Sequence, residues 1–254
     1  MCQLLGMNCN TPTDIVFSFE GFSRRGGLTG EHVDGWGIAF FEDDGCRIFL
    51  DYLPSVSSPI ADLVRQYPIK SRNVIAHIRK ATQGRVSLAN THPFRRELWG
   101  RDWIFAHNGN LADLPAMNGN RFTPVGTTDS EWAFCWLMNE LSVRFAQMPS
   151  HDLLYANLKS LLAELTGRGT FNFLLGSGKL LFAHCATDLH YIVRQAPFTS
   201  AHLADADLSV DFAQLTTNED RVAVIATHPL TDNETWTRMQ PGEFALLEGG
   251  ERVY

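Results

Sequence analysis

The sequence of 254 residues predicts an α+β fold, in which antiparallel strands form a sheet sandwich faced by helices. Three observations lead to this prediction. Short strand-like runs dominate the chain, and four longer helix-like stretches interrupt them. Turn residues separate several runs closely, as GSGK does between residues 171–177 and 180–186. Because parallel strands need long crossover connections, such short connections favour antiparallel hairpins.

The predicted strands are short segments rich in aliphatic, β-branched and aromatic residues, which suit a pleated and half-buried surface. They cover residues 2–7, 36–42, 47–53, 73–81, 103–108, 171–177, 180–186, 190–195, 222–227 and 244–250.

Four helices are predicted, and each has a recognisable start or end. They cover residues 14–25, 59–67, 128–148 and 151–167. The second follows Ser58 and has Pro59 in its first turn, where proline is favoured. The third opens with Thr128 and Glu131 at the spacing of a capping box. The fourth carries a stripe of leucines and stops at Gly167, as glycine often ends helices.

The composition limits the function. Lys and Arg number 21 against 28 for Asp and Glu, a net charge of −7 with no polybasic run, so nucleic acid and anionic membrane surfaces are not expected partners. No apolar run reaches the roughly 20 residues of a membrane span. A signal peptide would begin with a positively charged region, but no Lys or Arg precedes Arg24. Without repeats or linker-like segments, we expect one domain over residues 1–254.

The five cysteines are scattered and form no C-x-x-C pair, which disfavours a disulfide framework or a zinc knuckle. This usage favours a reducing compartment, so we expect a cytoplasmic protein. The histidines are dispersed and form no H-E-x-x-H motif, which makes a zinc hydrolase a weak alternative. We expect neither a metal nor a cofactor.

One predicted strand, residues 73–81, carries candidate binding residues. Val74, Ala76 and Ile78 would share one face, while His77 and Arg79 would share the other. An arginine fixed on a strand presents a planar fork that suits a carboxylate. The alternative is a solvated outer face.

Asn108 and Gly109 follow an apolar run, and two interpretations stay open. Asn-Gly is the commonest hairpin turn. Alternatively, the Asn108 amide and the Gly109 backbone N–H would form an oxyanion hole. Asp129, in the first turn of a predicted helix, has a similar ambiguity: it would stabilise the helix dipole, or pair with a substrate ammonium group.

Cys2 follows the initiator methionine directly. Removal of Met1 would place a thiol and a free α-amine on one residue, and an amine of pKa roughly 7.7–8.0 can serve as a general base. Such an N-terminal nucleophile needs no separate base. The alternative is a small buried residue at the start of a strand.

Together, a thiol, an oxyanion hole, a carboxylate-binding arginine and an ammonium-binding aspartate describe a site for glutamine. The residues resemble the class II glutamine amidotransferases. The resemblance rests on Cys2 and on DGWGIA (34–39), HIRKATQG (77–84), NTHPF (90–94), HNG (107–109) and TDSE (128–131), in the family's order. It implies the N-terminal-nucleophile hydrolase fold, a four-layer αββα sandwich.

The resemblance also implies a role for each residue. Cys2 would be the nucleophile of a γ-glutamyl thioester, with Asn108 and Gly109 as the oxyanion hole. Arg79 would bind the α-carboxylate of the substrate and Asp129 its α-ammonium group.

Neighbouring residues would complete the site. Ala81 and Thr82 would line the pocket, and His92 and His107 would support it without reacting. Trp36 would belong to the core, because DGWG would turn the chain beneath the nucleophile.

Two departures from better-known relatives affect the rim of the pocket. Lys80 stands where those relatives have an aromatic residue, and Gln83 where they have a histidine. They also carry an arginine shortly before the aspartate that corresponds to Asp34, where this chain reads EHVD.

The chain resembles the stand-alone group of the family, since no synthase domain follows the matched part. We therefore expect a glutaminase that releases ammonia from glutamine, with a separate ammonia-accepting synthase subunit as a candidate partner. A second reading is a γ-glutamyl amide or peptide hydrolase of thiol metabolism, as in ergothioneine biosynthesis. A third is a catalytically silent binding subunit, which retention of Met1 would favour.

Overall fold

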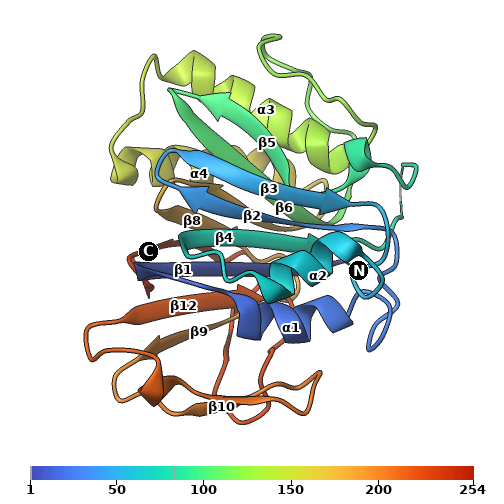
Figure 1. The fold of residues 1–254 in the computed structure, drawn as a ribbon. Coiled ribbons are helices and arrows are strands. Elements are labelled where there is room, and N and C mark those ends of the chain that lie inside the picture. Colours follow the sequence, from blue (N-terminus) through green and yellow to red (C-terminus); the bar gives the residue numbers. More distant parts are fainter. Residues whose placement is uncertain (1, 83) are drawn as a thin grey trace.

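Two antiparallel sheets form the centre of the computed structural model, which describes residues 2–82 and 84–254 (Figure 1). Within these residues, the seven strands of one sheet are, in spatial order, β13 (Thr237–Arg238), β9 (His190–Gln195), β12 (Arg221–Ala226), β1 (Gln3–Thr13), β4 (Ser71–Ile78), β2 (Trp36–Glu42) and β3 (Gly45–Asp51). The six strands of the other are β15 (Glu251–Arg252), β14 (Phe244–Glu248), β8 (Leu180–His184), β7 (Gly169–Ser177), β6 (Arg101–Leu111) and β5 (Phe94–Leu98). A separate two-stranded ribbon joins β10 (Ser200–His202) and β11 (Ser209–Asp211).

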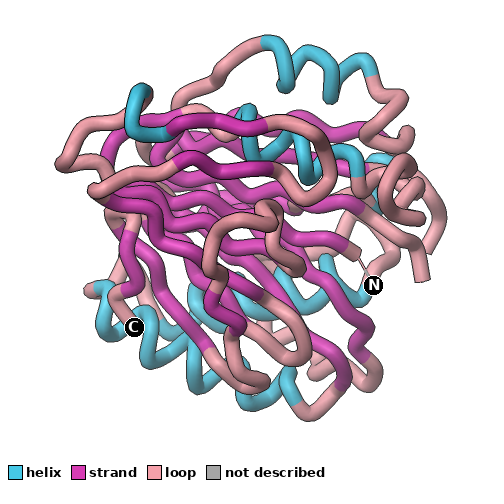
Figure 2. Tube along the Cα trace, turned by 90° about the horizontal axis from the view of Figure 1, so that it is seen from below, coloured by secondary structure: helices cyan, strands magenta, loops and turns pink. Residues whose placement is uncertain are grey.

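Helices cover the outer face of each sheet. Helices α1 (Val16–Arg24) and α2 (Pro59–Gln66) pack on the seven-stranded sheet, while α3 (Asp129–Arg144) and α4 (His151–Thr166) pack on the six-stranded one. Figure 2 shows the strands as a central band with helices on both sides. The predicted αββα sandwich is therefore confirmed. No helix in the described part of the chain has the length and apolarity to cross a membrane.

The inner faces of the two sheets share one apolar core. Leu4 and Ile75 of the larger sheet belong to the same buried cluster as Ile104 and Leu174 of the smaller one. A Cβ atom at Gly6 would lie only 3.1 Å from Leu174 Cδ1, so a small residue there lets the sheets approach closely. Close packing fixes how strand ends from the two sheets meet.

Three of the helices have a side-chain cap at their N-terminus. Ser58, Thr128 and Ser150 each accept a hydrogen bond from a backbone N–H of the following first turn. The capping box at α3 is only half formed, because the Glu131 carboxylate accepts hydrogen bonds from Val125 N and Gly126 N, at 3.0 and 2.7 Å. Glu131 therefore anchors the loop before α3.

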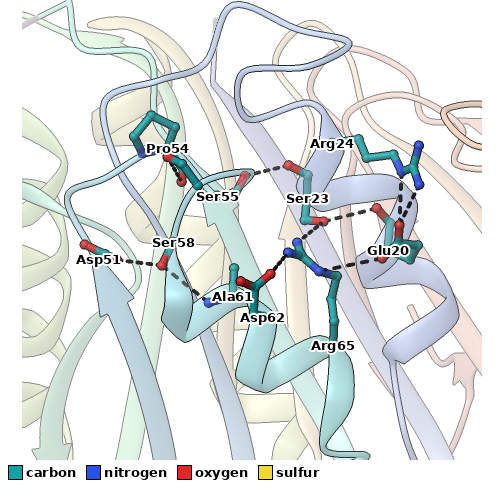
Figure 3. Close-up of polar contacts among 11 residues, drawn as sticks. Glu20, Ser23, Arg24, Asp51, Pro54, Ser55, Ser58, Ala61, Asp62 and Arg65 are labelled. Atoms are coloured by element: carbon teal, nitrogen blue, oxygen red, sulfur yellow. Dashed lines mark hydrogen bonds and ion pairs between the residues drawn. The ribbon is translucent and has the colours of Figure 1, made fainter.

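A polar network joins α1, α2 and the loop after β3 (Figure 3). Arg65 of α2 donates to Ser23 Oγ at 3.1 Å and forms ion pairs with Glu20 and Asp62. Ser55 Oγ donates to the Ser23 carbonyl at 2.6 Å. These contacts hold the C-terminal end of α1 against the loop.

Candidate active site

Cys2 lies immediately before β1. The backbone N–H of Lys80 points at its sulfur at 3.3 Å, and the thiol lies 3.4 Å from the Lys80 carbonyl. Since Leu4 faces the other sheet, strand alternation directs Cys2 to the same side. Burial raises the pKa of the Cys2 thiol, and the Lys80 backbone and Arg79 oppose that rise. A thiol held in this way needs a base before it can react.

The end of β4 positions Arg79. The strand ends at Ile78, earlier than predicted, and the Arg79 N–H then donates to the Gly35 carbonyl at 2.8 Å. The guanidinium donates to the carbonyls of Arg85 and Gly84, at 3.0 and 3.4 Å. Arg79 is 3% exposed, so the alternative of a solvated outer face is wrong.

The DGWG segment turns the chain beside Cys2. Asp34 Oδ2 accepts a hydrogen bond from Ala81 N at 2.7 Å. Gly35 has φ of +108°, and a Cβ atom there would lie 2.9 Å from the Asp51 carbonyl oxygen, so the turn requires glycine. Trp36 is fully buried in the core beneath α1, as predicted.

Asn108 and Gly109 lie within β6, paired with β7, so the hairpin-turn interpretation is wrong. A Cβ atom at Gly109 would approach Thr170 O to 1.9 Å, which excludes any other residue without rearrangement. Asn108 is 1% exposed, and neither Nδ2 nor Oδ1 of its side chain has a hydrogen-bond partner among the described residues. Because Ala106 faces the other sheet, strand alternation directs Asn108 to that inner side as well.

Asp129 is the first residue of α3, and its carboxylate reaches back to β6. Oδ2 accepts the N–H of Leu111 at 2.6 Å, while Oδ1 is 3.5 Å from Ser130 Oγ. Asp129 also lines a cleft of about 530 Å³, together with Trp132. One carboxylate oxygen therefore has a structural task, and the other keeps capacity for a further donor.

Thr82 connects the segment after Arg79 to β6. Its Oγ1 donates to Asn110 Oδ1 at 2.6 Å, and Asn110 directly follows Gly109. Through this bond, the residues after β4 meet the strand that carries Asn108. Gln83, which departs from the family pattern together with Lys80, and Met1 lie outside the described residues.

Three buried histidines lie behind these residues. The rings of His77 and His92 have centroids 4.2 Å apart, and burial lowers the pKa of His77 to about 3 and that of His92 well below its usual value. His107 contacts Ser130 Oγ at 2.8 Å and Thr170 O at 3.0 Å, and burial lowers its pKa too. All three are neutral at pH 7.

Two asparagines that sequence reasoning did not single out support the site. Asn90 Nδ2 donates to Arg85 O at 3.0 Å, and its Oδ1 accepts Thr127 N at 2.8 Å, which ties the loop that holds Arg79 to the start of α3. Asn172 Nδ2 donates to Asn108 O at 3.1 Å. Asn90 lies in the NTHPF segment, whereas no signal in the sequence marks Asn172.

Comparison with known proteins identifies the family of this chain. Residues 1–254 match the family described as glutamine amidotransferases class-II, and the chain belongs to that family. It is 54% identical to "Putative glutamine amidotransferase YafJ" of Escherichia coli over 254 residues, all of both chains. It is also 54% identical to a "Putative glutamine amidotransferase" of Haemophilus influenzae over 253 residues, which are all of this chain and 86% of that one.

Solved structures agree on the fold. A crystal structure described as a "predicted glutamine amidotransferase" from Pseudomonas aeruginosa has a TM-score of 0.79 and 47% identity, with both chains fully covered. The glutamine phosphoribosylpyrophosphate amidotransferase of Bacillus subtilis has a TM-score of 0.59 at 16% identity, over 99% of this chain and 48% of that one. The second likeness concerns the fold alone.

Proposed function

We propose that this protein hydrolyses the γ-amide of glutamine through a γ-glutamyl thioester on Cys2 and releases ammonia. In this proposal the chain acts as one glutaminase domain in the cytoplasm. A separate synthase subunit is the candidate acceptor of the ammonia.

The reaction would begin after Met1 is removed. The α-amine of Cys2 takes the thiol proton while the sulfur attacks the γ-carbonyl carbon of glutamine. The amine then gives that proton to the departing ammonia. A water molecule, activated by the same amine, attacks the thioester and releases glutamate and the thiol.

The substrate contacts follow the charges of the site. Arg79 would bind the α-carboxylate and the free side of the Asp129 carboxylate would bind the α-ammonium group, with Ala81 and Thr82 lining the pocket. Asn108 Nδ2 and the Gly109 N–H would stabilise the negative oxygen of the tetrahedral intermediate.

One observation carries the proposal: the Asn108 side chain is buried without a partner, directly before a position that only glycine fits. A buried and unsatisfied amide costs folding free energy of about 1–3 kcal/mol, and a substrate oxygen would provide the missing partner.

A γ-glutamyl amide or peptide is the second candidate substrate, and the charged residues beside Cys2 support it. Lys80 Nζ forms an exposed ion pair with Glu31 at 2.6 Å, beside the backbone groups that contact Cys2. A charged rim suits a leaving group larger and more polar than ammonia.

The test is a substrate screen with protein whose Met1 has been removed, as verified by intact mass. Glutamine and γ-glutamyl peptides are compared by release of glutamate and ammonia. We expect glutamine hydrolysis that Cys2→Ser abolishes. Turnover of γ-glutamyl peptides without ammonia release would replace the first candidate by the second, and no turnover of either would refute both.

A further inference from the structure

A cavity of about 290 Å³ lies on the outer face of the seven-stranded sheet, away from the Cys2 side. Its walls come from β1, the first turn of α1, β12 and the segment from Phe198 to Thr216, which contains the β10–β11 ribbon. In Figure 1 the β10 segment lies below α1. Met7 lines this cavity, whereas Leu4 and Cys2 are directed to the opposite face of the sheet.

The walls are mostly apolar and aromatic. They include Met7, Ile15, Phe17, Phe198, Phe212 and Val224. The rings of Phe17 and Phe212 meet edge to face, with centroids 5.6 Å apart. A cavity of this size, just below the roughly 300–1,000 Å³ usual for ligand pockets, suits a small hydrocarbon or aryl group.

The polar and charged residues of the lining are Thr13, Asp14, Ser18, Lys70, Arg194 and Thr216. Ser18 lines the cavity and is 5% exposed. The N-cap residue of α1, Ile15, provides no side-chain cap, so the backbone N–H groups of Phe17 and Ser18 keep their donor capacity. A helix N-terminus with free donors favours a negative charge.

Of the three charged lining residues, Asp14, Lys70 and Arg194, only Lys70 suits an anionic ligand. Arg194 is already neutralised, because it forms a two-bond pair with Glu234 at 2.8 and 2.6 Å. Lys70, in contrast, lines the cavity and is exposed, and it has no ion-pair or hydrogen-bond partner within the described chain. Asp14 binds Val16 N at 3.2 Å and would accept an ammonium group.

We propose that this cavity binds a small apolar carboxylate, with its hydrocarbon or aryl group between the phenylalanines. Its carboxylate faces Lys70, Ser18 and the start of α1. Two sources share this chemistry: a simple aryl or branched-chain acid, and an apolar α-amino acid, whose ammonium group would meet Asp14. The site is independent of the proposed glutaminase reaction.

The test is calorimetric titration of the full chain with 3-phenylpropionate, L-phenylalanine and the uncharged 3-phenylpropanamide. We expect at least one carboxylate to bind at one site, and the amide to bind at least about tenfold more weakly, since it lacks the charge. The carboxylate that binds more tightly identifies the source.

Variants locate the binding. Lys70→Met should weaken carboxylate binding about tenfold and Ser18→Ala several-fold. Lys179→Met, an exposed lysine outside this cavity, should leave binding unchanged, as should Arg79→Ala at the Cys2 site. In protein with ¹³C-methyl methionine, the Met7 methyl resonance should shift. A Kd weaker than about 10 mM for both acids, or binding lost in Arg79→Ala and kept in Lys70→Met, would overturn the proposal.

Discussion

Asn108 is the residue with the clearest chemical consequence. Its amide is buried, unpartnered and fixed on a central strand, so it is preorganised to donate to a ligand without further rearrangement. Such a donor contributes most to catalysis when it bonds the oxyanion more strongly than the ground-state carbonyl.

Replacing Asn108 by Ala should therefore lower kcat by about a hundred- to a thousandfold with little change in KM. Steady-state kinetics on the best γ-glutamyl substrate measures this. Asn118→Ala, at an exposed position, is the control. An unchanged kcat would contradict the proposed role of Asn108 in the oxyanion hole.

One substitution can separate the structural contact of Asp129 from its proposed role in binding substrate. Asp129→Asn keeps an oxygen that accepts the Leu111 N–H but removes the charge that would bind the substrate ammonium. We expect kcat/KM to fall about ten- to a hundredfold, as for other charge-assisted contacts, with the free energy of unfolding little changed. Kinetics and urea denaturation measure both.

Arg79→Ala should cause a loss of similar size from the other end of the substrate. For the Asp129 variant, the matched control is Asp113→Asn, because Asp113 lines the same cleft as Asp129. Normal kcat/KM in either site variant with every γ-glutamyl substrate would contradict the assigned binding role.

At the scale of elements, the local sequence pattern predicted the bounds of several strands and helices, whereas others depend on their neighbours in the fold. The strand at residues 36–42 has the predicted bounds, and α2 and α4 differ from theirs by one residue at the end. Short strands such as β5 were missed, because Phe94–Leu98 contains two arginines and a glutamate and depends on its partner β6.

The Asn-Gly pair shows where pattern reasoning fails. Its turn propensity is overridden because Asn108 and Gly109 pair with Asn172 and Phe171 across the sheet. Similarly, the candidate residues were recognisable from the sequence, but the hydrogen bond between Thr82 and Asn110 that joins their segments was not. It depends on which strands become neighbours.

The buried histidines between the elements predict a pH-dependent stability. Their pKa values are lowered in the folded protein and near 6.5 in the unfolded chain, so the unfolded chain binds more protons below pH 6.5. The free energy of unfolding should fall as pH decreases, by up to about 1.4 kcal/mol per histidine and pH unit. Urea denaturation at a series of pH values down to about 5 measures this.

His92→Phe keeps an aromatic ring beside Phe94. It should lower the number of protons taken up on unfolding by about one, so the free energy of unfolding should fall less steeply as pH decreases. His202→Asn is the control. His202 is exposed, and Asp232 raises its pKa, so its loss should not reduce the fall. Stability that does not vary with pH in this range would contradict neutral burial of the three rings.

At the scale of the whole molecule, the sandwich brings the start of β1 close to the ends of β4 and β6. Cys2 contacts Lys80, Ala81 contacts Asp34, and Thr82 contacts Asn110, so one chain of bonds spans both sheets. The predicted fold class is confirmed. The catalytic roles rest on this convergence and remain predictions.

The other cysteines provide internal controls for a reactive thiol. Burial raises the pKa of Cys9 and Cys46 to about 12, and it raises the pKa of Cys135 and Cys185 as well. These thiols stay protonated, and the proposed mechanism gives none of them an adjacent base. Cys2 alone gains an α-amine when Met1 is removed.

The most direct measurement is intact-protein mass spectrometry after treatment with a diazoketone analogue of glutamine. The sample is a mixture of processed and Met1-retaining protein. We expect one label on the processed form, located on Cys2, and none on the form in which the Cys2 nitrogen is an amide. Cys2→Ser should abolish labelling, and Cys9→Ser should not. Equal labelling of both forms, or labelling of another cysteine, would contradict Cys2 as an N-terminal nucleophile.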